Sequence, residues 1–168
     1  EAAQTMEMMP QVALKTRWNQ GSAGGGYCYN YYTPEHHVCG CVATAASQIM
    51  RYLHGTPDEE GAGGLEIPFP LETVEQKTFK CSYRGKELNL PMQGGTYCWT
   101  NMPFTQGEIQ NEGQKQNIGK LTSDVGIAVN MMYDMTDGKG SGAVTGTVPT
   151  RWREVFGYRQ ASWIGSVD

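Results

Sequence analysis

The 168-residue sequence predicts one α+β domain in which helices carry most of the core. Three segments place apolar residues at helical spacing, and the stretch between the first two offers only short strand-like pieces. Glycine accounts for 22 of the 168 residues, roughly twice its usual share, which indicates many loops and turns. No repeat and no Pro-rich or charged linker divides the chain, so we expect residues 1–168 to form a single domain.

The first predicted helix spans residues 41–53 and follows an irregular, Gly- and Tyr-rich loop over residues 19–40. Gly55 lies just beyond the helix as a stop signal. The small residues of this helix favour close packing inside the domain. Its predicted apolar face comprises Val42, Ala45, Ala46, Ile49 and Leu53.

Two more helices are predicted in the second half of the chain. One covers about residues 116–133, and the other covers residues 148–156, with Pro149 in its first turn and Gly157 as its stop signal. Between them, residues 136–146 are rich in glycine and should break the helical pattern. The predicted apolar face of the longer helix comprises Ile118, Leu121, Val125, Ala128, Val129 and Met132.

The middle of the chain, residues 56–113, is expected to form loops with one small hairpin. Its strand-like pieces lie at residues 78–81 and 96–99. We place the hairpin turn at Gly94–Gly95, because paired glycines are a common signal for a tight turn between strands.

Charge and hydropathy argue against two classes of partner. The formal net charge is -4, and no run of Lys or Arg forms an electrostatic footprint for nucleic acid or an anionic membrane surface. No stretch approaches 18 consecutive apolar residues, so no membrane span is predicted. The chain begins with Glu1 rather than Met and lacks a signal-peptide pattern, so we expect a processed or excised piece of a protein.

Five cysteines permit two disulfides and one free thiol. Cys39 and Cys41 are too close in sequence for an unstrained bridge. The simplest arrangement pairs Cys28 with Cys39, and pairs Cys81 with Cys98 across the predicted hairpin, which leaves Cys41 free. Such clips would brace a Gly-rich chain in an oxidising, extracellular compartment. Five reduced thiols in a cytosolic core remain the alternative.

Cys41 is the strongest chemical signal in the sequence. A thiolate is a nucleophile, and the start of a helix presents unpaired N–H groups and a positive partial charge that lower the pKa of a thiol. An inert cysteine in the core fits the same helical pattern, so the pattern alone does not decide between the two.

Seven blocks of sequence between Val12 and the C-terminus favour the interpretation of Cys41 as a nucleophile. They are Trp18–Gly21, Gly40–Ala45, Ser47–Tyr52, Tyr97–Met102, Asp124–Val129, Ser141–Ala143 and Phe156–Gln160. In this order they resemble the streptopain family of secreted papain-like cysteine peptidases, and the Gly-Cys-Val-Ala-Thr-Ala block is the most specific. The resemblance implies the helical, nucleophile-bearing half of a papain-like α+β fold, a protein or peptide substrate, a secreted or cell-surface location and no cofactor.

The resemblance also implies roles for individual residues. Cys41 would be the catalytic nucleophile, and the Gln20 side chain would help to form the oxyanion hole. Two preorganised donors, the Gln20 amide and the Cys41 backbone N–H, suit the negative charge of a tetrahedral intermediate. Ser141 and Gly142 would lie beside the substrate.

The family's general base has no counterpart in this chain. That base is a His in a Gly-Gly-His-Ala context beyond the Phe-Gly-Tyr block, whereas the only histidines here are His36, His37 and His54. His54 stands at the far end of the first helix, about 20 Å from Cys41 by helical rise. We therefore expect a second polypeptide, or a C-terminal segment absent from this chain, to carry the catalytic His, with His36 or His37 as the alternative base.

Two competing interpretations use the same cysteines. His36, His37, Cys39 and Cys41 offer possible zinc ligands within six residues, but structural zinc sites draw their ligands from two segments, so we expect no metal site. The alternative function is a catalytically inactive, disulfide-braced extracellular binding module in which Cys41 is merely structural.

Overall fold

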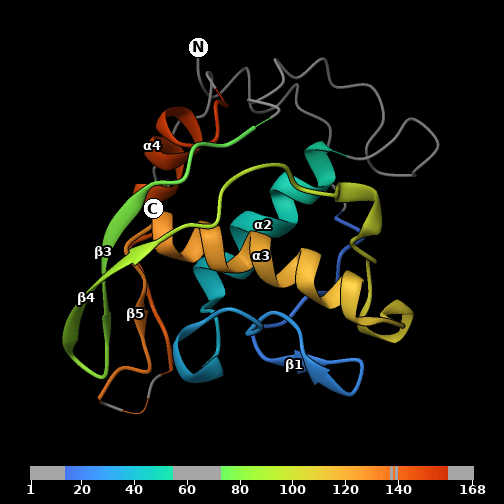
Figure 1. Ribbon diagram of the computed structural model, residues 1–168, viewed down its shortest axis with the longest axis horizontal. Helices are drawn as coiled ribbons and strands as arrows, with labels where there is room; N and C mark the ends of the chain where they lie inside the picture. The colour runs from blue at the N-terminus through green and yellow to red at the C-terminus, as the bar shows by residue number, and fades with distance from the viewer. Residues whose placement is uncertain (1–13, 55–72, 137, 139, 159–168) are drawn as a thin grey trace, which may run out of the picture.

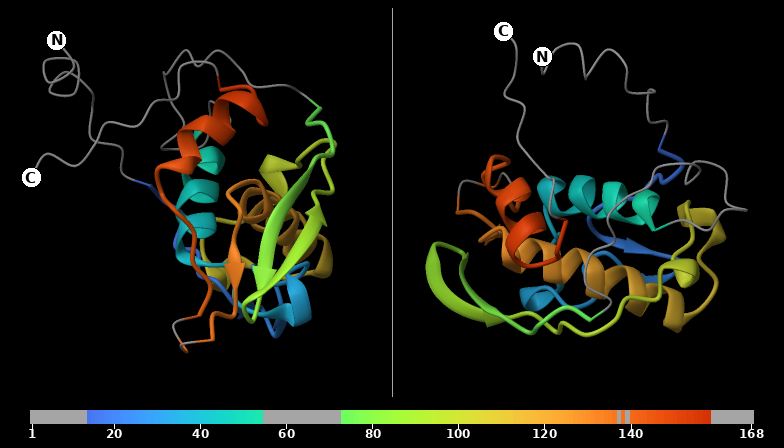
Figure 2. Two further views of the ribbon diagram at one scale, coloured as in Figure 1. Left: turned by 90° about the vertical axis from the view of Figure 1, so that its left-hand side faces the viewer. Right: turned by 90° about the horizontal axis from the view of Figure 1, so that it is seen from above.

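The computed structural model describes residues 14–54, 73–136, 138 and 140–158. Two helices cross at its centre, and a three-stranded sheet covers one of them (Figure 1). The two further views show that the longer helix, α3 (Glu112–Ala128), lies between α2 (Cys41–Leu53) and the sheet (Figure 2). The contacts agree, because α3 packs against both α2 and the strand β3 (Thr78–Tyr83). The α+β fold class is confirmed.

Helix α2 begins and ends where the sequence predicts, but its buried face is rotated from the predicted one. Ala45 and Ile49 are exposed, whereas Ala43, Ser47 and Met50 are buried. The small side chains of Ala43 and Ser47 let α2 pack closely against α3. This contact decides which face of α2 is buried, so the large apolar side chain of Ile49 stays exposed. Gly55, the predicted stop signal, lies outside the described residues.

The hairpin is real, but its predicted position is wrong. Strand β3 pairs antiparallel with β4 (Lys86–Pro91), and the connection is the two-residue turn Arg84–Gly85. Both turn residues have positive φ, 51° and 78°, as the tight turns of two-residue hairpins require. Gly94–Gly95 instead follows β4, and Gly95 forms an isolated bridge with Val74.

Helix α3 is shifted toward the N-terminus relative to the prediction. The Asn111 side chain accepts a hydrogen bond from the Gln114 N–H and so caps the helix at its start. At the other end Asn130 has a φ of 59°, which stops the helix. Met132–Tyr133 then forms the short strand β5, which pairs parallel with β3.

The remaining elements are short. Strands β1 (Ser22–Ala23) and β2 (Gly26–Tyr27) form a small ribbon, and three 3₁₀ turns are η1 (Pro34–His36), η2 (Trp99–Asn101) and η3 (Gln106–Glu108). Helix α4 (Thr147–Glu154) confirms the third predicted helix to within two residues at each end. The core is centred on α3 and includes Tyr29, Ala43, Met50, Met92, Ile118, Leu121, Val125, Met131, Tyr133 and Phe156. No helix in the described part of the chain has the length and hydropathy to cross a membrane.

Candidate active site

Cys41 is the first residue of α2, and its side chain is exposed. Gly40 before it has a φ of 94°, a conformation that residues with a side chain rarely adopt. A Cβ at Gly40 would also lie 2.7 Å from the Met131 Sδ and 3.3 Å from the Ser141 carbonyl oxygen. The first helical hydrogen bond runs from the Thr44 N–H to the Gly40 carbonyl over 3.1 Å. The N–H groups of the first turn of α2 therefore face the same end of the helix as the thiol.

The segment with Gln20 is fastened to the chain that leads into α2. The Gln20 carbonyl accepts a hydrogen bond from the Cys39 N–H over 3.0 Å. The Thr44 hydroxyl donates to the Asn19 carbonyl over 3.0 Å, and the Trp18 N–H donates to the Gln48 side chain over 2.9 Å. The structure therefore brings Gln20 to the same end of α2 as Cys41.

Ser141 and Gly142 also lie beside this end of α2, although they are a hundred residues away in sequence. The buried Ser141 hydroxyl donates to the Val38 carbonyl over 2.7 Å and accepts from the Asp134 N–H over 3.1 Å. The N–H and the carbonyl of Gly142 are both bonded to Met132. Ser141 and Gly142 are the residues that the resemblance places beside the substrate. In the structure, both make hydrogen bonds to other parts of the protein.

Asp134 is a neighbour of this site that sequence reasoning missed. Its carboxylate lies 2.7 Å from the Arg84 Nε and 3.5 Å from the His37 Nε2. The hydrogen bond from Arg84 holds the pKa of Asp134 below its usual range. No local pattern marks Asp134, because its partners come from the hairpin turn and from the loop before α2. The backbone of Asp134 has a φ of 45°, and the sequence did not predict this positive value.

The three histidines are all engaged in other contacts. His37 faces Asp134 and the ring of Tyr83. His36 stacks on Tyr27 with ring centroids 3.7 Å apart. His54 stacks on Trp99 with ring centroids 4.0 Å apart.

His54 also contacts the Tyr158 hydroxyl, 2.8 Å from its Nε2. Burial, and after it the nearby charge of Arg51, lower the pKa of His54 to about 4. This imidazole is part of an aromatic cluster at the far end of α2 from Cys41, which no local sequence pattern predicted.

The cysteines form no disulfide in the structure. Cys28, Cys39 and Cys81 are buried free thiols, and Cys41 and Cys98 are exposed free thiols. Burial raises the pKa of Cys28 to about 12 and the pKa values of Cys39 and Cys81 to about 11, so these three thiols are poor nucleophiles. The Cys81–Cys98 pairing was inferred from a hairpin between these residues, whereas the real hairpin turns three residues after Cys81. The two predicted pairs are therefore not seen, and the disulfide-braced module gains no support.

Asp124 is a second residue that sequence reasoning did not single out. Its carboxylate is fully buried on α3 and accepts hydrogen bonds from the Gln93 and Gly94 N–H groups and the Tyr97 hydroxyl. Burial raises the pKa of Asp124, although these three bonds oppose the shift. The carboxylate holds the segment after β4 against the helix.

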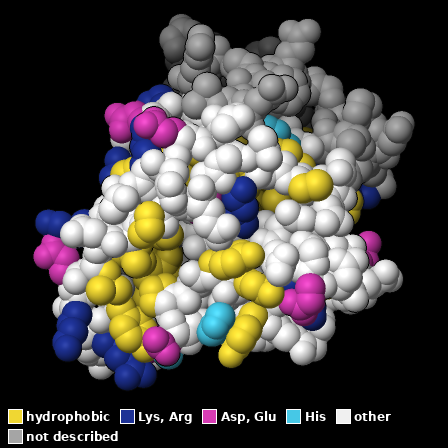
Figure 3. Space-filling model, viewed as in Figure 1, with side chains coloured by type: hydrophobic (Ala, Val, Ile, Leu, Met, Phe, Trp, Pro, Cys, Tyr) yellow, Lys and Arg dark blue, Asp and Glu magenta, His cyan; other side chains and the backbone are white. Residues whose placement is uncertain are grey.

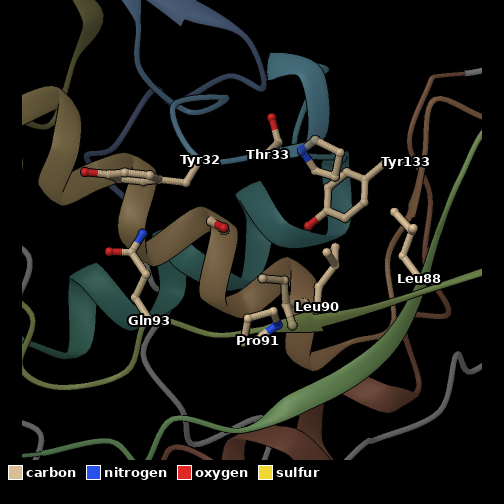
Figure 4. A pocket seen from close by; sticks show the side chains of 10 residues that line it. Tyr32, Thr33, Leu88, Leu90, Pro91, Gln93 and Tyr133 are labelled. Atoms are coloured by element: carbon tan, nitrogen blue, oxygen red, sulfur yellow. The ribbon is translucent and has the colours of Figure 1, made fainter.

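A shallow apolar pocket of about 430 Å³ lies between η1, α3 and β4. In Figure 4, Tyr32 and Gln93 stand at one end, and Leu88 and Tyr133 stand at the other. Figure 3 shows apolar side chains gathered on this face of the molecule, with Lys and Arg side chains along one border. The lining of the pocket includes neither Cys41 nor Gln20.

Two solved structures from Prevotella intermedia share this fold. A prointerpain A fragment matches with a TM-score of 0.64 at 22% identity, over 88% of this chain and 43% of that chain. The active wild-type interpain A cysteine protease matches with a TM-score of 0.64 at 23% identity, over 88% and 55% of the two chains. The papain-like fold that the sequence predicts is confirmed.

The sequence comparisons give the family. Streptopain of Streptococcus pyogenes is 28% identical over 164 residues, which cover 86% of this chain and 36% of streptopain. Streptopain of serotype M1 matches equally well. The profile of the peptidase C10 family matches residues 18–167. The chain therefore belongs to the peptidase C10 family, and it spans about a third of the length of the curated relatives that it matches.

Proposed function

We propose that this chain is the nucleophile-bearing part of a secreted cysteine endopeptidase and that Cys41 attacks the peptide bond. The observation that carries the proposal is the exposed thiol of Cys41 at the start of α2, in a chain of the peptidase C10 family. The N–H groups of the first helical turn lie at the same end of α2 as this thiol, and such donors suit the negative charge that develops on a tetrahedral intermediate.

The reaction proceeds through a thioester. The Cys41 Sγ bonds to the carbonyl carbon of the substrate, the C–N bond breaks, and the leaving amine takes a proton from a protonated histidine. Water then gives a proton back to that histidine, and its oxygen bonds to the carbonyl carbon of the thioester. The C–S bond breaks, and the sulfur returns to Cys41. The products are the amine released in the first step, a carboxylic acid and the restored cysteine–histidine pair, and no cofactor takes part.

Gln20 stabilises the oxyanion in this proposal. Its backbone is bonded to Cys39, so its side chain starts from a segment of fixed position relative to the Cys41 N–H. Two donors held in place before the reaction are worth more than flexible ones, because no reorganisation is needed when the charge develops.

The catalytic histidine comes from a segment of the enzyme outside these 168 residues. His36, His37 and His54 pack against Tyr27, Tyr83 and Trp99, respectively. The greater length of the streptopain relatives supports this assignment. The proposed substrate is a protein or peptide, and the proposed location, secreted or cell-surface, follows from the resemblance to the streptopain family.

Paired cysteine variants of the complete enzyme test the proposal. Cys41→Ala should abolish cleavage of an unfolded protein substrate. Cys98→Ala removes the other exposed thiol and should leave cleavage unchanged. Retained cleavage by Cys41→Ala would refute the assignment of the nucleophile.

The source of the base needs a second comparison. This chain alone and the chain together with the segment that carries the histidine are assayed on the same substrate. Robust, Cys41-dependent cleavage by the chain alone would contradict the second segment and would make His36 or His37 the base.

A further inference from the structure

The Ser141 hydroxyl joins two segments that are distant in sequence. It donates its only proton to the Val38 carbonyl over 2.7 Å and accepts from the Asp134 N–H over 3.1 Å. The side chain is buried, with 6% of the residue exposed. Removing this hydroxyl would leave a carbonyl and an N–H without their partner, so the two bonds fix both segments.

A side-chain contact reinforces the same junction. The Asp134 carboxylate lies 3.5 Å from the Nε2 of His37, the neighbour of Val38, and 2.7 Å from the Arg84 Nε. Residues 37 and 38 are thus held at two adjacent points by the chain around Asp134 and Ser141. Gly40 permits this close approach, because a Cβ there would lie only 3.3 Å from the Ser141 carbonyl oxygen.

We propose that Ser141 is a positioning residue for Cys41, an inference that rests on the proposed function. The chain between Val38 and Cys41 is held on one side by the Ser141 hydroxyl and on the other by the Gln20 carbonyl, which accepts from the Cys39 N–H. Ser141 therefore sets the Cys41 thiol and backbone N–H relative to Gln20. Small errors in such geometry are costly, since a displacement of about 1 Å can lower a rate by about 10²-fold.

This role differs from a direct contact with the substrate. The Ser141 proton is already donated to Val38, so the hydroxyl has no donor left for a peptide carbonyl. A positioning residue acts on the transition state and lowers kcat when it is lost, whereas loss of a substrate contact raises KM.

The test uses three variants of the complete enzyme. Ser141→Ala removes the hydroxyl, and Ser141→Thr keeps a hydroxyl at the same position. Ser123→Ala is the matched control, because Ser123 is also a buried serine and its hydroxyl makes no hydrogen bond that joins segments among the described residues. Each variant is measured for kcat and KM, for thermal unfolding, and for the iodoacetamide alkylation rate of Cys41 by peptide mass spectrometry.

The proposal expects Ser141→Ala to lower kcat about tenfold or more with KM changed less than about twofold. Ser141→Thr should recover most of the loss, and Ser123→Ala should match the wild type. An unchanged kcat in Ser141→Ala, or an effect on KM alone, would overturn the proposal. If Ser141→Thr does not fold, the contrast of Ser141→Ala with Ser123→Ala decides.

The alkylation rate separates this proposal from the proposed function. If the wild-type enzyme cleaves no substrate, the proposed function fails. The effect of Ser141 on the position of Cys41 can still be measured through the alkylation rate of the Cys41 thiol. Ser141→Ala should then change the alkylation rate of Cys41 at least about threefold at fixed pH, while Ser123→Ala leaves it unchanged. An equal rate in both variants would refute the positioning role.

Discussion

The carbonyl oxygen of Gln20 accepts a hydrogen bond from the Cys39 N–H over 3.0 Å, two residues before the exposed thiol of Cys41. This backbone bond holds the Gln20 segment near the start of α2, although residues 20 and 39 are not neighbours in sequence. It is the geometric basis for assigning Gln20 to the oxyanion hole.

Substitution of Gln20 tests that assignment. Gln20→Ala in the complete enzyme should lower kcat by roughly 10² to 10³ with little change in KM, because the lost hydrogen bond forms mainly in the transition state. Steady-state kinetics on a peptide substrate measure both constants. Gln106→Ala, at an exposed glutamine in η3, is the control and should have no effect. An effect of Gln20→Ala confined to KM would indicate substrate binding instead.

Gly40 should tolerate no side chain. Gly40→Ala would combine a φ of 94° with a Cβ only 2.7 Å from the Met131 Sδ, so we expect it to destabilise the protein by about 2 kcal/mol or more and to lower kcat. Gly146→Ala is the control, because a Cβ there meets nothing within 4 Å and the φ is -62°. Urea unfolding measures the difference. Equal stability of the two variants would contradict the strained geometry before Cys41.

His54 should make the stability of the fold depend on pH. Its pKa is about 4 in the folded protein and ~6.5 when unfolded, so the unfolded state binds the proton more readily between these values. The contribution of His54 is fully present above about pH 6.5 and is lost as the pH falls toward 4, at a cost of about 3 kcal/mol.

The measurement is urea unfolding of the wild type and His54→Gln at about pH 7.5 and about pH 4.5. The wild type should lose more stability on acidification than His54→Gln does. An identical pH dependence of the wild type and His54→Gln would show that His54 does not titrate in this way.

Counting thiols tests the absence of disulfides. Iodoacetamide without reductant should modify Cys41 and Cys98 in the native protein, because these two thiols are exposed and the other three are buried. After unfolding, still without reductant, all five cysteines should react. Intact mass gives the count, and peptide mapping gives the positions. A single reactive thiol after unfolding, mapped to Cys41, would instead support two disulfides among the other four cysteines.

The helices were predictable because their signals are local. The apolar spacing after Cys41 and the Pro149–Gly157 signals gave α2 and α4 nearly complete. The hairpin was misplaced, because Gly94–Gly95 is the stronger turn signal in sequence, whereas the actual turn uses Arg84 with positive φ. Turn propensity identifies residues that can form a turn. Which turn joins the strands depends on tertiary contacts, here the pairing of β3 with β5 and the packing of β3 on α3.

The candidate site also contains features that local sequence signals predict and features that depend on the fold. The position of Cys41 at the start of a helix was predictable from local spacing, whereas the role proposed for Gln20 comes from the family resemblance. The contacts of Ser141 with Val38 and of His37 with Asp134 span about a hundred residues of sequence. No spacing rule connects such residues, because the fold alone brings them together. The same reason explains why Asp124, which bonds to a segment thirty residues away, was missed.

The most direct test of the account is the mass of the covalent intermediate. The complete enzyme is mixed with a peptide ester, quenched in acid during turnover, and analysed by intact mass and peptide mapping. We expect an added acyl group on the peptide that contains Cys41, and no such group in Cys41→Ala. An acyl group on another residue, or steady turnover with no acylated enzyme and full activity in Cys41→Ala, would contradict it.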